Sequence, residues 1–407
     1  MLQIAAKERV AILGGGIMGC LAALELADRG VEVTLYEANS GLLQKASRGG
    51  EAKLHHGYVY ANEPDAHTAR KLATAYTNFQ PIVERLLGDR SKGAFVKSRP
   101  FTYALHADSM LDEASIDHHL RATHQFVLQA QGDALGCRPP AQPRRLNADD
   151  LVRHFDPTQI TAAWSTDEYA IDSLSLSKAI LERIAENPLI SVRLKQNVEA
   201  VSRTGCSLHV VAGFHSNSFD QIINCAWAGR LEIDASMGVS PPRKWMFRHK
   251  YGVRLPSGSA PEDSCSATFT LGPFGDVVRY ADGSMYLSWY PACMTGISFD
   301  ERAPEQPSEL KGDAASQMVE ETINALGELM PPLAKISSQA REAAIVRGGA
   351  IFALGDTDID DAESELHQRH DVGISSYGNY HTVDTGKYTM APLLAVKCAD
   401  RVLALAE

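Results

Sequence analysis

The chain has 407 residues, of which 44% are hydrophobic and 22% charged, and its formal net charge at pH 7 is −11. These proportions are typical of folded globular proteins, and the length predicts two domains or one two-lobed enzyme. The acidic balance argues against nucleic acid as a partner. No apolar run is long enough for a transmembrane segment, and seven scattered cysteines without a CxxC pair favour a reducing, cytoplasmic location.

The chain begins with a strand–helix–strand pattern. Residues 9–13 are predicted to form a buried strand of a parallel sheet, because Val10 to Leu13 are apolar without alternation. Residues 17–29 carry one apolar stripe at helical spacing, Gly30 ends the helix, and residues 31–36 form a second strand. This order predicts a βαβ unit.

The remaining sequence predicts a β-rich middle and a return to alternating helices and strands. Helices are expected at 65–87, 109–129, 147–154, 174–186, 317–329 and from about 389 to 406. Strand signals dominate from about residue 192 to Cys225 and again between 248 and 290. We therefore expect a discontinuous nucleotide-binding domain that is interrupted by a β-rich lobe, with ligands at the carboxyl ends of the parallel strands.

A glycine-rich loop follows the first strand directly. The run Gly14-Gly15-Gly16-Ile17-Met18-Gly19 satisfies G-x-G-x-x-G, in which Gly14 permits a tight turn, Gly16 lets the backbone approach a pyrophosphate, and Gly19 lets the helix pack on the strand. The helix N-terminus supplies N–H groups and partial positive charge for phosphates. Glu37, at the end of the second strand, is expected to accept the ribose hydroxyls. The motif predicts a dinucleotide without separating FAD from NAD.

A small polar loop after Glu37 narrows the choice of cofactor. Residues 47–57 read S-R-G-G-E-A-K-L-H-H-G, and here the sequence resembles the D-amino-acid oxidase superfamily, which includes glycine oxidase, sarcosine oxidase and L-2-hydroxyglutarate dehydrogenase. In these families this loop crosses the flavin. The resemblance implies FAD as the cofactor, with Ser47, Gly49 and Gly50 among its contacts.

The same resemblance points to a catalytic histidine near the end of the loop. His55-His56-Gly57 resembles the His-x-Gly of the hydroxyglutarate enzymes, which favours His55. It also resembles the Lys-Leu-Ile-His-Gly run of FAD-linked glycerol-3-phosphate dehydrogenases, which favours His56. Both histidines stay candidates for a general base, because a hydroxyl proton must be removed when an alcohol is oxidised.

Two later segments extend the resemblance. Val198 matches a valine that meets the adenine through its backbone, whereas Trp227 holds a position that the superfamily gives to glycine in its "VVNAAG" strand end. The C-terminal run resembles the superfamily's last loop, whose following helix points N–H groups at flavin N1 and O2, where reduced flavin carries negative charge. The contacts implied there are Gly386, Lys387, Tyr388 and Thr389.

A small organic acid needs a cation to hold its carboxylate, and arginine does so with two parallel hydrogen bonds. Arg248 lies in a strand whose alternation puts Lys250 on its own face and Tyr251 on the other, and either face is a candidate pocket wall. Arg347 resembles an arginine that precedes the last loop in several superfamily members. The substrate-binding candidates are Arg248, Tyr251, Tyr290 and Arg347.

These observations predict an α+β fold with a glutathione-reductase-like FAD-binding βαβ domain and an inserted β-rich substrate domain. The FAD-binding domain is expected at 1–95, 165–240 and 336–407, and the substrate domain at 96–164 and 241–335. No metal is predicted, because His118, His119 and His124 lack spaced partners and the acidic run at 357–363 lacks the EF-hand pattern.

The predicted function is FAD-dependent oxidation of a C–O or C–N bond in a small organic acid, by hydride transfer to flavin N5. Oxygen or another acceptor reoxidises the flavin. The double histidine favours a hydroxy acid slightly over an amino acid. The alternatives are an NAD-dependent dehydrogenase and a non-catalytic flavin-binding subunit.

Overall fold

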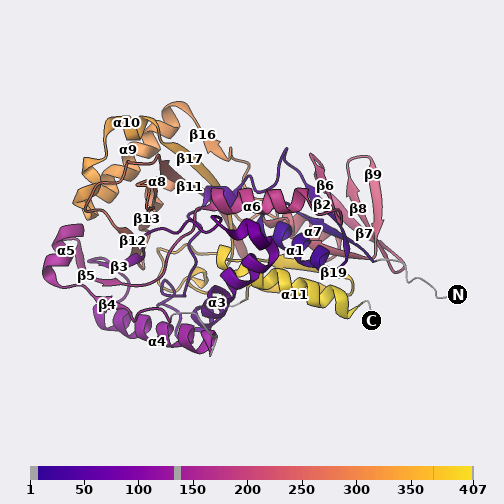
Figure 1. Ribbon diagram of the computed structural model, residues 1–407, viewed down its shortest axis with the longest axis horizontal. Coiled ribbons are helices and arrows are strands. Elements are labelled where there is room, and N and C mark those ends of the chain that lie inside the picture. The colour runs from indigo at the N-terminus through magenta and orange to yellow at the C-terminus, as the bar shows by residue number, and fades with distance from the viewer. Residues whose placement is uncertain (1–7, 133–138, 370, 406–407) are drawn as a thin grey trace.

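The computed structural model describes residues 8–132, 139–369 and 371–405. Its two large sheets occupy opposite ends of the long axis (Figure 1). One has six strands in the order β18-β19-β10-β1-β2-β6, the other has ten, and a three-stranded sheet of β7 (Ala200–Thr204), β8 (Ser207–Ala212) and β9 (His215–Phe219) lies beside the first.

The six-stranded sheet is built from segments far apart in the sequence. Its strands are β1 (Arg9–Leu13), β2 (Glu32–Glu37), β6 (Ile190–Leu194), β10 (Gln221–Asn224), β18 (Gly373–Tyr377) and β19 (Tyr380–Asp384), and all pair in parallel except β18. The predicted βαβ start is confirmed, with α1 at Ile17–Asp28.

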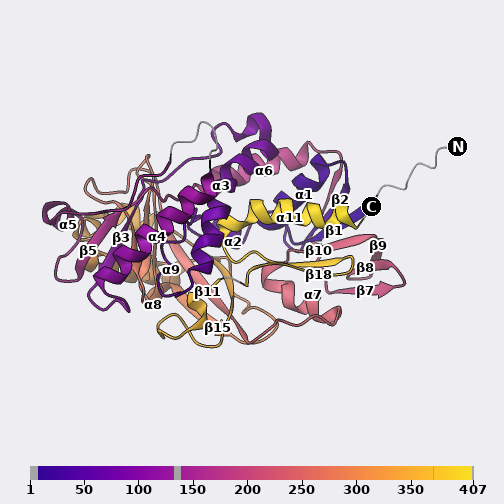
Figure 2. The same cartoon turned by 90° about the horizontal axis from the view of Figure 1, so that it is seen from below.

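Both faces of this sheet are covered, which explains the unbroken apolar run of β1. Val10 and Ile12 pack against helices α1, α3 (His67–Leu87), α6 (Ser173–Ala185) and α11 (Ala391–Ala404). Ala11 and Leu13 pack against the three-stranded sheet and α7 (Arg230–Ser236). Figure 2 shows the helices on one side and β7–β9 with α7 on the other.

The spacing between α1 and β1 is set by glycines. A Cβ at Gly19 would stand 2.0 Å from the carbonyl oxygen of Gly14, so only glycine lets the helix approach the loop this closely. Gly14 itself has φ +102°, and a Cβ there would lie 2.7 Å from Cα of Ala226. Two of the three motif glycines are therefore required by close backbone contacts.

The ten-stranded sheet contains most of the β-rich segments. Its strands are β3 (Phe101–His106), β4 (Arg144–Arg145), β5 (Ile160–Ser165), β11 (Trp245–Leu255), β12 (Ser266–Thr270), β13 (Gly275–Arg279), β14 (Met285–Trp289), β15 (Met294–Ser298), β16 (Glu309–Leu310) and β17 (Ile345–Leu354). Helix α9 (Gly312–Leu329) packs on one face, where its apolar side contacts Val253 and Leu287.

The remaining helices lie close to their expected ranges. Helix α4 runs over Glu113–Gln131, four residues later than expected, because the Asp112 carboxylate caps its N-terminus. Helix α5 is Ala148–His154, and α11 follows a short 3₁₀ turn at Tyr388–Met390. In the described part of the chain, no helix combines the length and apolarity needed to cross a membrane.

The domain boundaries stay a prediction. The six-stranded sheet draws its strands from the ranges expected for the FAD-binding domain. Strand β17 falls within the expected range 336–407, yet it pairs with β11 along its whole length and is part of the ten-stranded sheet. Gly348 and Gly349 of β17 therefore bring the ten-stranded sheet next to the segments that surround the glycine loop.

Candidate active site

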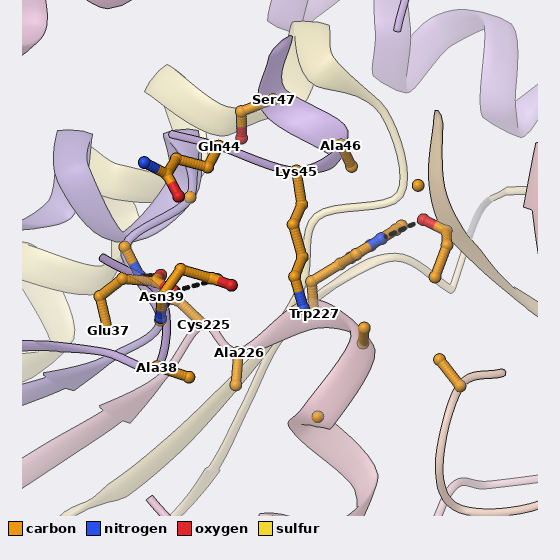
Figure 3. A pocket seen from close by; sticks show the side chains of 18 of the residues that line it. Glu37, Ala38, Asn39, Gln44, Lys45, Ala46, Ser47, Cys225, Ala226 and Trp227 are labelled. Carbon is orange, nitrogen blue, oxygen red and sulfur yellow. Dashed lines mark hydrogen bonds between the residues drawn. The ribbon is translucent and has the colours of Figure 1, made fainter. Parts of the chain in front are cut away.

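A cavity of about 890 Å³ opens at the carboxyl ends of β1, β2 and β10. The glycine loop, the end of β2 and helix α2 (Ala46–Gly49) form one part of its wall (Figure 3). The rest is contributed by residues 196–199, 225–229, 302–308, 348–350 and 385–388. This volume is within the range of pockets that enclose a whole small molecule.

The N-terminus of α1 faces this cavity. Gly16 is the N-cap residue and makes no side-chain capping bond, while the Ile17 N–H donates to Ser47 Oγ at 2.9 Å. Gly14, Gly15, Gly16 and Ser47 all line the cavity. An uncapped N-terminus of a twelve-residue helix beside glycine backbone provides the N–H donors and positive potential that a pyrophosphate requires.

Glu37 lies at the end of β2 with its carboxylate turned to the glycine loop. Its Oε2 accepts from the Gly15 N–H at 2.9 Å, and its Oε1 accepts from the Asn39 N–H at 2.7 Å and from the Asn39 side-chain amide. A carboxylate has about four acceptor positions, and three are used here. One position is left for a ribose hydroxyl, and a second becomes free if the Asn39 side chain turns away.

Trp227 closes the cavity at the end of β10. Its φ is +47°, in the left-handed region, which directs the indole towards β17, where Nε1 donates to the Ala350 carbonyl at 2.7 Å (Figure 3). The departure from glycine therefore introduces a hydrogen bond between the two sheets. Val198 also lines the cavity, as expected for a residue near the nucleotide.

The C-terminal loop is held by its own backbone geometry. Gly386 has φ +62°, a Cβ there would meet Val372 at 2.4 Å, and its N–H donates to Asp384 at 3.0 Å. Lys387 and Tyr388 line the cavity, and the buried Tyr388 hydroxyl has no hydrogen-bond partner within the described ranges. The loop thus contains one buried polar group that is unsatisfied in the described structure.

Thr389 connects this loop to the polar loop at 47–57. Its Oγ1 accepts from the His55 N–H at 2.9 Å and donates to the Lys53 carbonyl at 3.2 Å. Gly49 approaches β17, where its Cβ would stand 3.1 Å from the Gly348 carbonyl oxygen. Thr389, Gly49 and Gly50 do not line the cavity themselves.

A second group of side chains lies where the polar loop meets the ten-stranded sheet. This polar cluster consists of Glu51, Lys53, His55, Glu168, Lys250, Asp276 and Tyr290. Lys53 is almost fully buried, and its ammonium contacts Asp276 at 3.0 Å, the Thr268 hydroxyl and the ring face of Phe101 at 4.0 Å. Burial opposes its charge, but Asp276 and the neighbouring glutamates raise the pKa of Lys53 above its usual value.

The two candidate histidines have different surroundings. The His55 ring lies between Glu51, with Nε2 at 3.8 Å, and Glu168, with Nδ1 at 3.9 Å. The His56 ring is buried 3.8 Å from the ring of Tyr76. Burial lowers both pKa values, that of His55 well below its usual range and that of His56 to about 3. Both imidazoles are therefore neutral at pH 7, and only His55 belongs to the polar cluster.

Glu51 is the carboxyl of the cluster whose pKa is raised into the neutral range. Burial, followed by repulsion from Asp276, raises its pKa to about 7, although Lys53 and Lys250 act in the opposite direction. Its Oε2 is shielded from solvent and has no hydrogen-bond partner in the part of the chain that the structure describes. A carboxyl of this kind can exchange a proton near neutral pH.

The four substrate candidates do not converge on one point. Arg248 is buried and pairs with Asp358 at 2.8 Å, and Arg347 donates twice to Glu309, at 2.9 and 2.7 Å. Tyr251 donates to the Pro307 carbonyl at 2.7 Å on the other face of β11. Tyr290 lies below the Lys250 ammonium, 4.1 Å from the ring centroid.

Several residues of the site were not predicted from the sequence. Glu168 and Asp276 come from distant segments, and their carboxylates are recognisable only once the fold brings them to Lys53. Asn39 was open to prediction, since an amide two residues after a strand-end carboxylate commonly bonds to it. His249 and residues 302–308 line the cavity without any sequence signal.

The comparisons with known proteins identify a family from the sequence and a fold from solved structures. Residues 9–362 match the family model described as FAD dependent oxidoreductase. Among solved structures, glycine oxidase from Geobacillus kaustophilus has 13% identity and a TM-score of 0.69, with 98% of this chain and 95% of that chain covered. The L-α-glycerophosphate oxidase of Mycoplasma pneumoniae with FAD bound has 16% identity and a TM-score of 0.65, at the same coverage of both chains.

L-Proline dehydrogenase from P. horikoshii has 14% identity and a TM-score of 0.60, with 98% of this chain and 94% of that chain covered. No curated protein matches this sequence. At these identities the similar structures establish the fold alone. They confirm the predicted fold class, and the family model confirms FAD as the cofactor.

The glycine loop and Glu37 yield a prediction about FAD affinity. Glu37→Ala removes the acceptor of the Gly15 N–H and a candidate acceptor for a ribose hydroxyl, and each buried donor left unpaired costs about 1–3 kcal/mol. We expect the FAD dissociation constant, measured by fluorescence titration of the apoprotein, to rise about 5- to 150-fold.

Glu32→Ala is the control, because Glu32 is an exposed residue at the other end of the same strand. An unchanged FAD affinity in Glu37→Ala, at unchanged thermal stability, would show that the carboxylate only organises the loop.

Proposed function

The chain belongs to the family of FAD-dependent oxidoreductases, and we propose that it oxidises the C–N bond of a small amino acid. When bound, FAD supplies a hydride acceptor at flavin N5 and is reoxidised by oxygen or another acceptor. Glu51 is the observation that carries this proposal: it is a carboxyl with an unpartnered oxygen, within the loop at 47–57 that resembles the flavin-crossing loop of the superfamily.

The residues around the cavity fit FAD. Gly14–Gly16 and the start of α1 would hold the pyrophosphate, and Glu37 would hold a ribose. The loop at Gly386–Thr389 would lie against the flavin ring, with the N-terminus of α11 behind it.

An amino acid arrives at neutral pH with a protonated amine, which cannot lose hydride from its α-carbon until the nitrogen is neutral. An ionised Glu51 can bind that ammonium and take its proton, because its pKa of about 7 lies near the working pH. The neutral ring of His55 then helps to exclude water and separates Glu51 from Glu168. The proton ends on a carboxyl oxygen whose burial favours the protonated form.

A small hydroxy acid is the second candidate, and His55 is the observation that favours it. The neutral imidazole has its Nδ1 3.9 Å from the Glu168 carboxylate, which is beyond hydrogen-bond distance, and a shift that closed this gap would orient the ring as a base. Its low pKa, however, makes it a weak acceptor for a hydroxyl proton. Glycine oxidase and glycerophosphate oxidase are both among the similar structures, so this fold is used for an amino acid and for an alcohol.

The first test is anaerobic reduction of the purified yellow protein by a panel of amino and hydroxy acids. We expect small amino acids to bleach the flavin absorbance and the matching 2-hydroxy acids to leave it unchanged. Bleaching by hydroxy acids alone would contradict the proposal in favour of the second candidate. A bound flavin that no acid reduces would instead indicate a non-catalytic flavin-binding subunit.

Glu51 predicts a pH dependence with a definite sign. The carboxyl is protonated below a pH of about 7 and ionised above it, so the rate of flavin reduction at low amino acid concentration should rise through that pH. In Glu51→Gln this rise of the rate with pH should disappear. The rate at pH 8 should fall about 10²- to 10⁴-fold, the usual range for a lost general base.

The control is Glu342→Gln, since Glu342 is exposed at the end of α10 (Ser338–Glu342). A Glu51→Gln enzyme that keeps the wild-type profile would exclude this carboxyl as the proton acceptor.

The histidine pair separates the two substrate classes. If the substrate is an amine, His55→Ala should slow anaerobic flavin reduction by less than about tenfold, well below the effect of losing a base. His56→Phe should have no larger effect, because the His56 ring is surrounded by aromatic side chains. Both rates are measured by stopped-flow absorbance near the maximum of oxidised flavin, at about 450 nm. A loss of about 10²-fold or more in His55→Ala alone would identify His55 as the base and support a hydroxy acid.

A further inference from the structure

Both arginines expected to bind a carboxylate already have one as a partner. The Arg248 guanidinium is 2.8 Å from Asp358, and the Arg248 residue is only 2% exposed. Arg347 donates from two nitrogens to a single oxygen of Glu309, which pairs the edge strand β16 with β17. A substrate carboxylate would have to displace a carboxylate of the protein at either position, so neither arginine is ready to bind it.

Lys250 lies on the face of the sheet that is turned to the cofactor segments. It is directly opposite Gly349 in the β11–β17 pairing, and paired residues project to the same face. A Cβ at Gly349 would come within 3.0 Å of Ala46 in α2. Gly349 and Ala46 on this face line the cavity, as do His249 and Gly348 on the other face, whereas Lys250 itself is not among the lining residues and belongs to the adjacent polar cluster. Tyr251, the next residue of β11, packs against the α9 side.

The Lys250 ammonium has an aromatic neighbour but no anionic one in contact. It lies 4.1 Å above the ring centroid of Tyr290, and no hydrogen bond or ion pair to it is found among residues 8–132, 139–369 and 371–405. Asp276, the nearest candidate counterion, is bonded to Lys53 at 3.0 Å and to the Thr268 hydroxyl at 2.7 Å. A largely desolvated ammonium without a counterion attracts an anion strongly.

Lys250 and Glu51 also lie on opposite sides of the polar cluster. Lys250 is part of the ten-stranded sheet, and Glu51 is part of the loop that follows α2. They influence each other electrostatically without forming an ion pair. The polar cluster therefore contains a cation and a carboxylate oxygen that are not bonded to each other, the two opposite charges that a zwitterion requires.

We propose that Lys250, with the ring of Tyr290 beside it, binds the carboxylate of the substrate, and that Arg248 instead anchors the acidic loop through Asp358. The inference rests on the proposed function in one respect: Glu51 takes the amino end of the same molecule. It predicts selectivity for short α-amino acids, because the side chain must fit between the two sheets while both ends are bound.

The test uses acetate and the uncharged acetamide as probes of the FAD-loaded enzyme, with binding followed by the change in the visible flavin spectrum. Acetate has no amino group and cannot be oxidised at a C–N bond, so the result does not depend on which bond the enzyme attacks. We expect Lys250→Met to weaken acetate binding about 10- to 100-fold, with acetamide binding and FAD content unchanged. Lys250→Arg should retain most of the acetate affinity.

Lys244→Met is the matched control, since Lys244 is exposed and pairs with Asp356 just before β11. The double variant Arg248→Met, Asp358→Asn removes the competing arginine and its partner together, and its acetate affinity should stay within about threefold of wild type. An unchanged acetate affinity in Lys250→Met, a larger loss in the double variant, or no acetate binding by the wild-type enzyme would each overturn the inference. If Lys250→Met loses acetate binding and only hydroxy acids bleach the wild-type flavin, Lys250 still binds the substrate carboxylate, but the proposed oxidation of an amino acid is wrong.

Discussion

The buried ammonium of Lys53 is the interaction on which the arrangement of this site depends. It is bonded to Asp276 and Thr268 of the ten-stranded sheet, while the carbonyl of the same residue is bonded to Thr389 of the C-terminal loop. A buried charge stripped of one partner destabilises a protein strongly, so the network tolerates little displacement. One residue thus fixes the polar loop, the ten-stranded sheet and the C-terminal loop relative to one another.

This network also decides which charges remain available. Asp276 is used by Lys53, Asp358 by Arg248 and Glu309 by Arg347, and each of these pairs joins segments that come from different parts of the chain. Structural ion pairs and functional charges draw on the same residue types, and the sequence alone does not separate them. Pairing is what distinguishes them here: in the described structure Lys250 contacts the ring of Tyr290 but no carboxylate, and one buried oxygen of Glu51 has no hydrogen-bond partner.

The parts of the site that were predictable are those whose contacts are local. The glycine loop, α1 and Glu37 lie within one βαβ unit, and the close contact between Gly14 and Gly19 spans a single turn. The polar cluster was not predictable, because Lys53 and Asp276 are 223 positions apart and meet only through the pairing of β12 with β13. The same limit explains the adjacent histidines: Tyr76 and Glu168 determine their different surroundings, and both lie outside the motif.

Glu51 makes the stability of the folded protein depend on pH in the opposite direction to a carboxylate that is paired with a cation. A folded-state pKa of about 7, above the ordinary value of 4.5, means that the folded protein binds this proton more tightly than the unfolded chain does. Stability therefore falls as the pH rises from about 4.5 to about 7, where the folded protein must accept an ionised Glu51. Asp276, whose pKa is lowered mainly by Lys53 and Lys250 against the effect of burial, contributes in the opposite sense. In the function proposed above, an ammonium bound beside Glu51 would relieve this penalty at neutral pH, so part of the substrate's binding energy would come from a charge that is unfavourable in the empty protein.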